Sequence, residues 1–158
     1  MVEYEITVKG FELRDYKKWK ESVENTKLID VEDVGKWKEL NKAIIKPGEM
    51  KTIGRKADKP VDIGIPEMMF TYKMVSRNHG VFYNNKKDGN IYYKDTSKNG
   101  TSLWRLDWAI FRGHELQRLS KDQWYDLRNH SILVPGAETD NYLREIAKSP
   151  VVEVRKVA

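Results

Sequence analysis

Apolar and polar residues alternate along several short segments of the chain, as they do in β-strands that have one buried face. Residues 3–13, EYEITVKGFEL, show this alternation and predict a half-buried strand. From about 42 to 104 the chain consists of short segments of the same kind separated by turns, and residues 124–136 and 151–157 resume the pattern. Regular short strands with turn signals predict an all-β sandwich or barrel.

Turn-forming residues separate the predicted strands. Pro47-Gly48 predicts a turn between two short strands within residues 42–55. The sequence Lys87-Asp88-Gly89-Asn90 lies between the aromatic-rich segments GVFYN and NIYYKD, which predicts a β-hairpin. The polar segments 56–60 and 96–100 are expected to form further loops between strands.

Two segments have the period of a helix instead of a strand. In residues 14–28, Tyr16 and Trp19 recur at helical spacing among lysines and glutamates, which predicts an amphipathic helix. Residues 139–150 predict a second helix, which ends before Pro150. Both helices are expected to be additions to an architecture that consists mainly of strands.

Residues 104–124 are rich in aromatic residues and show no regular period. Trp104, Trp108 and Trp124 could stack on nucleic-acid bases, but large aromatic side chains belong more often to the core. We therefore expect these three tryptophans to be buried.

Composition points to one globular domain. The chain has 158 residues, of which 39% are hydrophobic and 34% charged, so it can bury a sizeable core. A net charge of +5 favours acidic partners, but the charges form no long run, so nucleic acid is not expected to be the main ligand. The chain has no cysteine, which excludes disulfides, thiolate nucleophiles and most structural zinc sites.

The chain carries no sign of a targeting or membrane segment. The first residues, MVEYEITVKG, lack the basic and then apolar order of a signal peptide. No segment approaches the about eighteen consecutive apolar residues that a membrane span requires. The expected location is therefore the cytoplasm.

Catalytic chemistry finds little support in the sequence. Ser76 and His79 form a close serine–histidine pair, but residues three apart on a strand point to opposite faces. A loop serine and a structural histidine account for this pair more simply. The histidines at 79, 114 and 130 lack the spacing of metal ligands. We expect no catalytic residue, no cofactor and no metal.

Anion binding has more support. Arg55 follows a glycine at the end of a predicted strand, and Ser76-Arg77 stands where another strand should begin. Lys98-Asn99-Gly100 predicts a tight turn. A serine hydroxyl and loop cations could converge on a phosphate through charge-assisted hydrogen bonds. From this chemistry alone, ordinary surface turns explain the same residues equally well.

Three motifs in order decide between these readings. They are Gly54-Arg55, then Ser76-Arg77-Asn78-His79, then Asn99-Gly100-Thr101, with Asp95 before the last turn. Together they resemble the forkhead-associated (FHA) domain. The resemblance runs from about 42 to 104 and extends more loosely to 124–136, which looks like the late hairpin of the family.

The resemblance implies a fold and a function for the whole chain. It implies a single domain over residues 1–158, built as a sandwich of two antiparallel sheets whose loops bind phosphothreonine peptides. Residues 14–41 and 105–123 look like insertions into this fold, helical in the first and irregular or helical in the second. The helix ending at residue 149, predicted over 139–149, is a further addition. The implied partner is a protein that contains phosphothreonine.

The resemblance also assigns the contacts to the phosphopeptide. Arg55 looks like the arginine that reaches the phosphate, and Ser76 like the hydroxyl donor to a phosphate oxygen. Arg77 beside it is expected to supply side-chain or backbone contacts. Asn99 resembles the amide that holds the peptide backbone. Lys98 stands where the family often has a small polar residue, and it should add positive charge.

Other motif residues are expected to shape the site without contacting the peptide. Gly54, Gly100 and Thr101 look architectural, because glycine permits tight turns and close approach of backbones. His79 is expected to tie the loops together. Met74, two residues before Ser76, is expected at the rim of the site, where it would favour an aliphatic residue of the peptide.

Two alternatives compete with phosphothreonine binding. The chain could be an assembly subunit that uses this fold as a scaffold and binds without phosphate. It could also be a domain that binds RNA or a single strand through its basic surface. Binding of matched phosphorylated and unphosphorylated peptides separates the first alternative from phosphopeptide recognition, and steep salt dependence would indicate the second.

Overall fold

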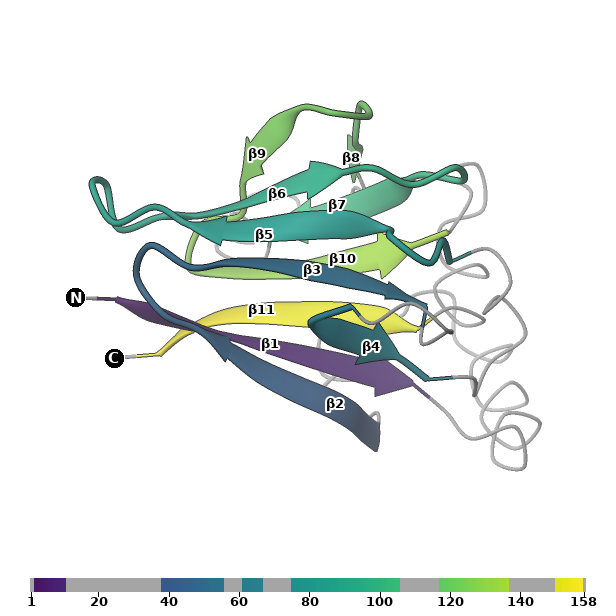
Figure 1. Cartoon of the computed structure of the whole chain (residues 1–158), viewed down its shortest axis with the longest axis horizontal. Coiled ribbons are helices and arrows are strands. Elements are labelled where there is room, and N and C mark those ends of the chain that lie inside the picture. Colours follow the sequence, from purple (N-terminus) through teal and green to yellow (C-terminus); the bar gives the residue numbers. More distant parts are fainter. Residues whose placement is uncertain are drawn as a thin grey trace.

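The computed structural model describes residues 2–10, 38–55, 61–66, 75–105, 117–136 and 150–157, which form strands in two sheets (Figure 1). In spatial order the six-stranded sheet contains β2 (Lys38–Ile45), β1 (Glu3–Gly10), β11 (Val151–Val157), β10 (His130–Pro135), β7 (Thr101–Arg105) and β8 (Gln117–Arg118). The five-stranded sheet contains β4 (Ile63–Ile65), β3 (Met50–Arg55), β5 (Gly80–Asn84), β6 (Ile91–Asp95) and β9 (Trp124–Asp126). The predicted all-β sandwich is confirmed.

Neighbouring strands of both sheets run antiparallel throughout the described residues, with one exception. Strands β3 and β4 are parallel, and Gly54 lies opposite Gly64. Among the described residues, no helix has the length and apolar character that crossing a membrane requires.

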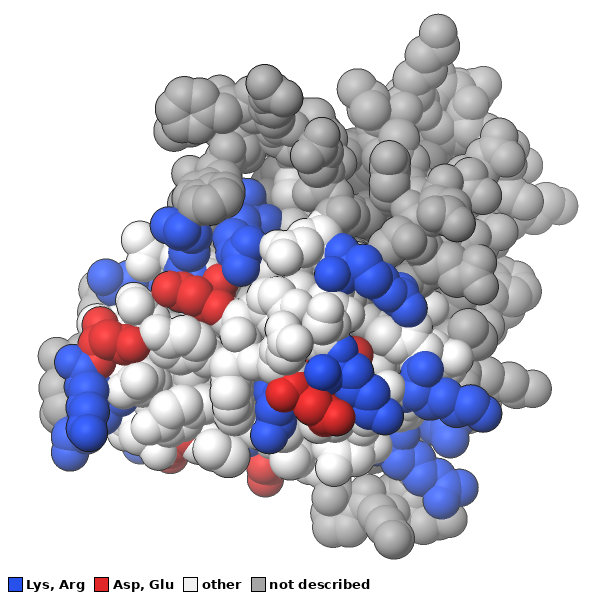
Figure 2. Space-filling view, turned by 90° about the horizontal axis from the view of Figure 1, so that it is seen from above, with Lys and Arg blue, Asp and Glu red and all other residues white. Residues whose placement is uncertain are grey.

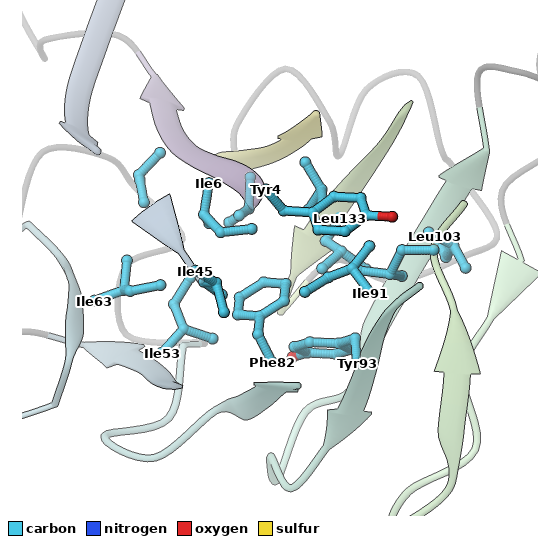
Figure 3. Packing of buried hydrophobic residues seen from close by; sticks show 14 of the residues in the cluster. Tyr4, Ile6, Ile45, Ile53, Ile63, Phe82, Ile91, Tyr93, Leu103 and Leu133 are labelled. Carbon is cyan, nitrogen blue, oxygen red and sulfur yellow. The ribbon is translucent and has the colours of Figure 1, made fainter. Parts of the chain in front are cut away.

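The core lies between the two sheets, where the inward residues of each strand meet (Figure 3). Tyr4, Ile6 and Val8 of β1 are almost completely buried, as their alternation predicts. The rings of Phe82 and Tyr93 pack against each other with centroids 5.1 Å apart. Burying an aliphatic or aromatic side chain of this size contributes roughly 1.5–3 kcal/mol, so this shared layer holds the sheets together.

The turn at Pro47-Gly48 and the hairpin turn are confirmed, whereas the loop predicted at 56–60 lies outside the described residues. Gly48 follows Pro47 with φ at +83°, between β2 and β3. Strands β5 and β6 form the predicted hairpin, and their register runs from Gly80 opposite Asp95 to Asn84 opposite Ile91. Because β6 leaves this hairpin and ends at Asp95, the loop that follows it lies at the opposite end of the sandwich (Figure 1).

The expected hairpin at residues 124–136 is wrong. Strand β9 pairs with β6 in one sheet, whereas β10 pairs with β7 and β11 in the other. The side chain of Leu127, between the two strands, is completely buried in the core, and Arg128 has φ at +59°. This short connection therefore carries the chain from one sheet to the other.

Strands also occupy parts of the segments expected as insertions. Strand β2 begins at Lys38, which pairs with Gly10 of β1, so residues 38–41 belong to the sheet and not to the insertion 14–41. Strand β8 lies inside the range 105–123. Residues 38–41 and strand β8 were missed because their residues are mainly polar and carry no apolar alternation, whereas residues 42–45 of β2 lie in a predicted strand. The helices predicted at 14–28, which contains Tyr16 and Trp19, and at 139–149 lie outside the described residues. Trp108, in the segment 105–123, lies outside them as well.

The tryptophans divide into two environments. Trp104 is buried, as expected, but the expectation was wrong for Trp124, which is 42% exposed. Trp124 lies on the edge strand β9 opposite Lys94, and this pair faces away from the core because the next pair, Tyr93 and Tyr125, faces inward. The Lys94 ammonium lies 4.9 Å from the centre of the Trp124 ring, in a cation–π contact.

Candidate functional site

Hydrogen bonds join the end of β3 to the turn at residues 76–79, and join that turn to the turn at 96–100. The N–H of Arg55 donates to the carbonyl of Ser76 at 2.9 Å, and the N–H of His79 donates to the carbonyl of Ile53 at 2.9 Å. The N–H of Lys98 donates to Ser76 Oγ at 3.1 Å. Residues that the sequence analysis took from three separate motifs therefore lie side by side at one end of the sandwich.

His79 lies at the centre of these loops and is completely buried. Its Nδ1 accepts the N–H of Ser76 at 3.0 Å, so the ring proton is on Nε2. Nε2 then donates to the carbonyl of Gly100 at 3.0 Å and to Thr101 Oγ1 at 2.9 Å. Burial lowers the pKa of His79 to about 4, although Asp95 nearby acts in the opposite direction. The ring is therefore neutral at neutral pH.

A second set of bonds holds the turn at 96–100. The Asp95 carboxyl accepts Ser97 Oγ at 2.7 Å and Thr101 Oγ1 at 3.0 Å through the same oxygen, Oδ1. Ser97 Oγ in turn accepts the N–H of Gly100 at 2.8 Å. Tyr93, whose pKa is raised by burial, brings its hydroxyl within 3.2 Å of Thr101 Oγ1. These side chains are buried, so their bonds hold the turn from inside the protein.

Two glycines allow close approach of the chain. A Cβ atom at position 54 would lie 2.0 Å from the carbonyl oxygen of Arg77, so only glycine lets β3 lie against the turn at 76–79. Gly100 has φ at +87°, in the left-handed region that side chains disfavour. A Cβ atom there would also overlap the guanidinium of Arg118, on β8.

The remaining predicted residues are accessible to a ligand. Arg77 and Lys98 are exposed, and Arg55, Ser76 and Asn99 are partly exposed. Across the top of the molecule, Lys and Arg side chains stand in separate groups with uncharged surface between them (Figure 2). The described part of this face therefore shows no continuous basic surface. Met74 lies outside the described residues.

Sequence reasoning missed two residues of the site. Ser97 carries a detectable signal, since a serine two residues after an aspartate often bonds to it within a turn. Arg118 carries none, because it belongs to a different strand and reaches the turn only in the folded chain. Its guanidinium donates to the carbonyl of Asn99.

Comparison with known proteins agrees with this geometry. The family model of the FHA domain matches residues 51–134, more than half of the chain, and the chain therefore belongs to the FHA family. The match contains every motif residue of the two turns and of the end of β3. FHA domains are binding modules and not enzymes, and they generally recognise phosphopeptides through clusters of basic residues. No relative among the curated proteins matches the chain in sequence.

Solved structures share the fold at low sequence identity. The FHA domain of a hypothetical protein of Arabidopsis thaliana has a TM-score of 0.54 and 16% identity, over 100% of this chain and 88% of that chain. Full-length yeast Pml1p has a TM-score of 0.59 and 17% identity, over 99% and 83%. The FHA domain of CT664 from Chlamydia trachomatis has a TM-score of 0.53 and 12% identity, over 99% of each.

Proposed function

We propose that this FHA domain binds phosphothreonine peptides and that Arg55, Ser76 and Lys98 hold the phosphate, with Arg77 beside them. The hydrogen bond from the Lys98 N–H to Ser76 Oγ carries the proposal, because it joins two loops that bear candidate phosphate contacts. A hydroxyl that accepts one bond still has its own hydrogen to donate. Ser76 can therefore donate to a phosphate oxygen while it holds the neighbouring loop.

Charge supports the same assignment. A phosphothreonine carries about −1.5 to −2 charges at neutral pH, and a hydrogen bond to a charged group contributes roughly 1.5–3 kcal/mol. Arg77 and Lys98 are exposed at the two loops. Asp95, the acidic residue just before the turn at 96–100, is buried and bonded to the side chains of Ser97 and Thr101. The neutral His79 adds no charge, and its bonds to Ser76 and Gly100 suit it to holding the loops in place.

Asn99 is the candidate contact to the peptide backbone. It lies next to Lys98 in the same turn and is partly exposed, and its own carbonyl is held by Arg118. An amide side chain offers one acceptor and two donors, which matches the carbonyl and N–H of an extended peptide. Asn99 would therefore hold the peptide next to the phosphorylated residue.

A preference for phosphothreonine over phosphoserine follows if the extra methyl enters a small pocket between the loops of Ser76 and Asn99. Burying one methyl contributes roughly 0.8 kcal/mol, which is about fourfold in affinity. A β-branched side chain also has fewer rotamers to lose on binding. Both effects act in the same direction, so the preference should exceed about fourfold.

The test is a calorimetric titration of three matched peptides, with threonine, phosphothreonine or phosphoserine at the same position, selected from a library with phosphothreonine fixed at the centre. In Arg55→Ala, affinity for the phosphothreonine peptide should fall by at least about 2 kcal/mol, because a charge-assisted bond to the phosphate is lost. Lys86→Ala is the matched control, since it removes one exposed charge from the turn at the other end of β6. Thermal unfolding checks that both variants fold.

Each contrary result names a different reading. Equal binding of the unphosphorylated peptide would indicate a phosphate-independent assembly subunit. Equal binding of phosphoserine would mean that charge alone drives recognition and that the methyl pocket does not exist. Affinity within about twofold of wild type in Arg55→Ala would remove this arginine from the site.

A further inference from the structure

The outer face of the five-stranded sheet carries exposed apolar side chains. Among the described residues, the large apolar side chains that are exposed are Met50 on β3, at 57%, and Trp124 on β9, at 42%. Tyr83 of β5 is partly exposed and faces away from the core, because its neighbour Phe82 faces into it. Met50 lies opposite Tyr83, and the ring centroids of Tyr83 and Trp124 are 6.1 Å apart. Met50, Tyr83 and Trp124 therefore form an apolar strip across β3, β5, β6 and β9, which are neighbours in this order (Figure 1).

Lys94 is the cation beside this strip. It lies on β6 opposite Trp124, and its ammonium is 4.9 Å from the centre of that ring. Within the described part of the chain, this cation–π contact is its interaction, and no carboxylate pairs with the ammonium. Asp126, two residues from Trp124 on the same face, accepts the N–H of Arg128 at 2.8 Å instead. Since an ammonium has three N–H donors, Lys94 can bind an anion while it stays over the ring.

We propose that the apolar strip is a second binding surface, which takes a short segment of a partner protein that carries an apolar side chain next to an aspartate or glutamate. The apolar side chain lies on Met50 and Tyr83, and the carboxylate meets Lys94. Contiguous exposed apolar side chains mark interaction sites, and tyrosine and tryptophan are enriched among the residues that dominate binding energy. The carboxylate supplies the opposite charge that the described residues do not place beside Lys94.

The size of the apolar strip favours a short segment over a second copy of this chain. Neighbouring strands are about 4.8 Å apart, so the four strands span about 14 Å, which is the length of about four extended residues. A stable dimer buries about 800 Å² on each copy. Three partly exposed side chains supply only a fraction of that area.

The Met50 end of the strip lies away from the candidate phosphate contacts. Met50 begins β3 and Arg55 ends it, so the two residues are about 16 Å apart along the strand. Binding at the strip requires no phosphate. A partner that carries both a phosphothreonine and an apolar–acidic segment therefore gains affinity from the linked second contact, with no change at the phosphate site.

The test selects short random peptides without phosphate, displayed on phage, on the wild-type domain. Selected peptides should share an apolar residue next to an acidic one. By fluorescence anisotropy, Met50→Ser and Trp124→Ser should each weaken binding of a selected peptide by at least about tenfold, because each removes an apolar anchor. Replacing the acidic residue by its amide should cost wild type about fivefold and Lys94→Gln nothing, since the ion pair is then already lost.

Lys156→Gln is the matched control, because it removes one exposed charge from the other sheet and should leave binding unchanged. Thermal unfolding checks that the variants fold, and Met50→Ser should leave binding of a phosphothreonine peptide unchanged. Loss of phosphothreonine binding in wild type is thereby distinguished from loss of this second surface.

Three results would overturn the proposal. The first is a selection that yields no apolar–acidic peptide. The second is a selected peptide whose affinity is the same in Met50→Ser and Trp124→Ser as in wild type. The third is a dimer of wild type in sedimentation that Met50→Ser abolishes, because a second copy of the chain would then occupy the strip.

Discussion

Strand β6 lies between two turns, residues 85–90 before it and 96–100 after it, and each turn contains a glycine with positive φ. Most bonds of the first turn lie within it or join it to its own strand, although the carbonyl of Gly89 also accepts the hydroxyl of Tyr4, on β1, at 2.7 Å. Asp88 accepts the N–H of Asn90 at 2.8 Å and the hydroxyl of Tyr92 at 2.6 Å, and Asp88 is exposed. These partners lie two and four residues away in the chain.

The second turn has buried bonds and distant partners as well as local ones. His79 bonds to Gly100 from twenty-one residues away, and Ser76 accepts the N–H of Lys98 from twenty-two residues away. The hairpin turn therefore has mainly local bonds and one distant bond from Tyr4, whereas the candidate binding turn is bonded to the neighbouring loop through both His79 and Ser76. The binding surface is thus coupled to the fold of the whole domain.

The largest expected contrast lies between the two aspartates. Asp95→Ala removes the acceptor of Ser97 and Thr101 inside the protein and leaves buried donors unpaired, so it should lower the free energy of unfolding by at least about 3 kcal/mol. Asp88→Ala should change stability much less, because Asp88 is exposed and water replaces its bonds. Urea unfolding of both variants checks the difference. Equal losses would contradict the distinction between the turns.

A pH dependence should come next in size. Since the folded pKa of His79 is about 4 and its ordinary value is 6.5, the unfolded chain binds a proton in this interval and the folded chain does not. The contribution of His79 to the free energy of unfolding should therefore be fully present above pH 6.5. The free energy of unfolding should fall by on the order of 3 kcal/mol as the pH decreases to about 4. Acidification should therefore weaken the bonds by which His79 holds the turn at 96–100. The hairpin turn at 85–90 contains no histidine, so this effect does not reach it.

Urea unfolding between pH 4.5 and 7 measures this dependence, and NMR titration of the His79 ring measures its protonation directly. Glu153 does not interfere, because the hydrogen bond from His130 lowers its pKa to about 2 and its contribution is lost only below about pH 4.5. A ring that protonates near pH 6.5 while the protein stays folded would contradict the buried neutral state.

The smallest contrast compares the two glycines. Gly89→Ala and Gly100→Ala both place a side chain at positive φ, which costs roughly 1–2 kcal/mol, so both should lose a similar amount of stability. A Cβ atom at position 89 has only Val2 nearby, at 3.8 Å, whereas one at position 100 displaces Arg118 from Asn99. Since Arg118 holds the carbonyl of Asn99, the proposed contact to the peptide backbone, peptide affinity should fall about fivefold in Gly100→Ala, as for the loss of one hydrogen bond, and stay unchanged in Gly89→Ala, as measured by calorimetry. Equal affinities would show that the bond from Arg118 does not position Asn99 for the peptide.

Much of this architecture could be predicted from local pattern. Alternation located most strands and the inward residues of β1, and turn residues located the β5–β6 hairpin. The motifs led to the FHA family, which the comparison confirms. The roles of Arg55, Ser76, Arg77, Lys98 and Asn99 stay predictions, although the structure brings their turns together.

The errors concern properties that near neighbours in the chain do not set. The resemblance to the family led to the expectation that β9 and β10 pair, but a local pattern does not show which sheet a strand joins. Trp124 was expected to be buried because large aromatic side chains usually are, but its position on an edge strand leaves it exposed. Strand β8 escaped notice because two exposed polar residues carry no alternation.

By itself the sequence determined most of the strands, the turn at Pro47-Gly48, the hairpin turn and the motif residues, because these depend on the chemistry of near neighbours in the chain. Only the tertiary structure decided that His79 is neutral, that the Ser76 hydroxyl meets the Lys98 N–H, and that Arg118 lies against Asn99. Burial and long-range hydrogen bonds set these properties, and both arise only when the two sheets pack and bring distant loops to the same end of the sandwich.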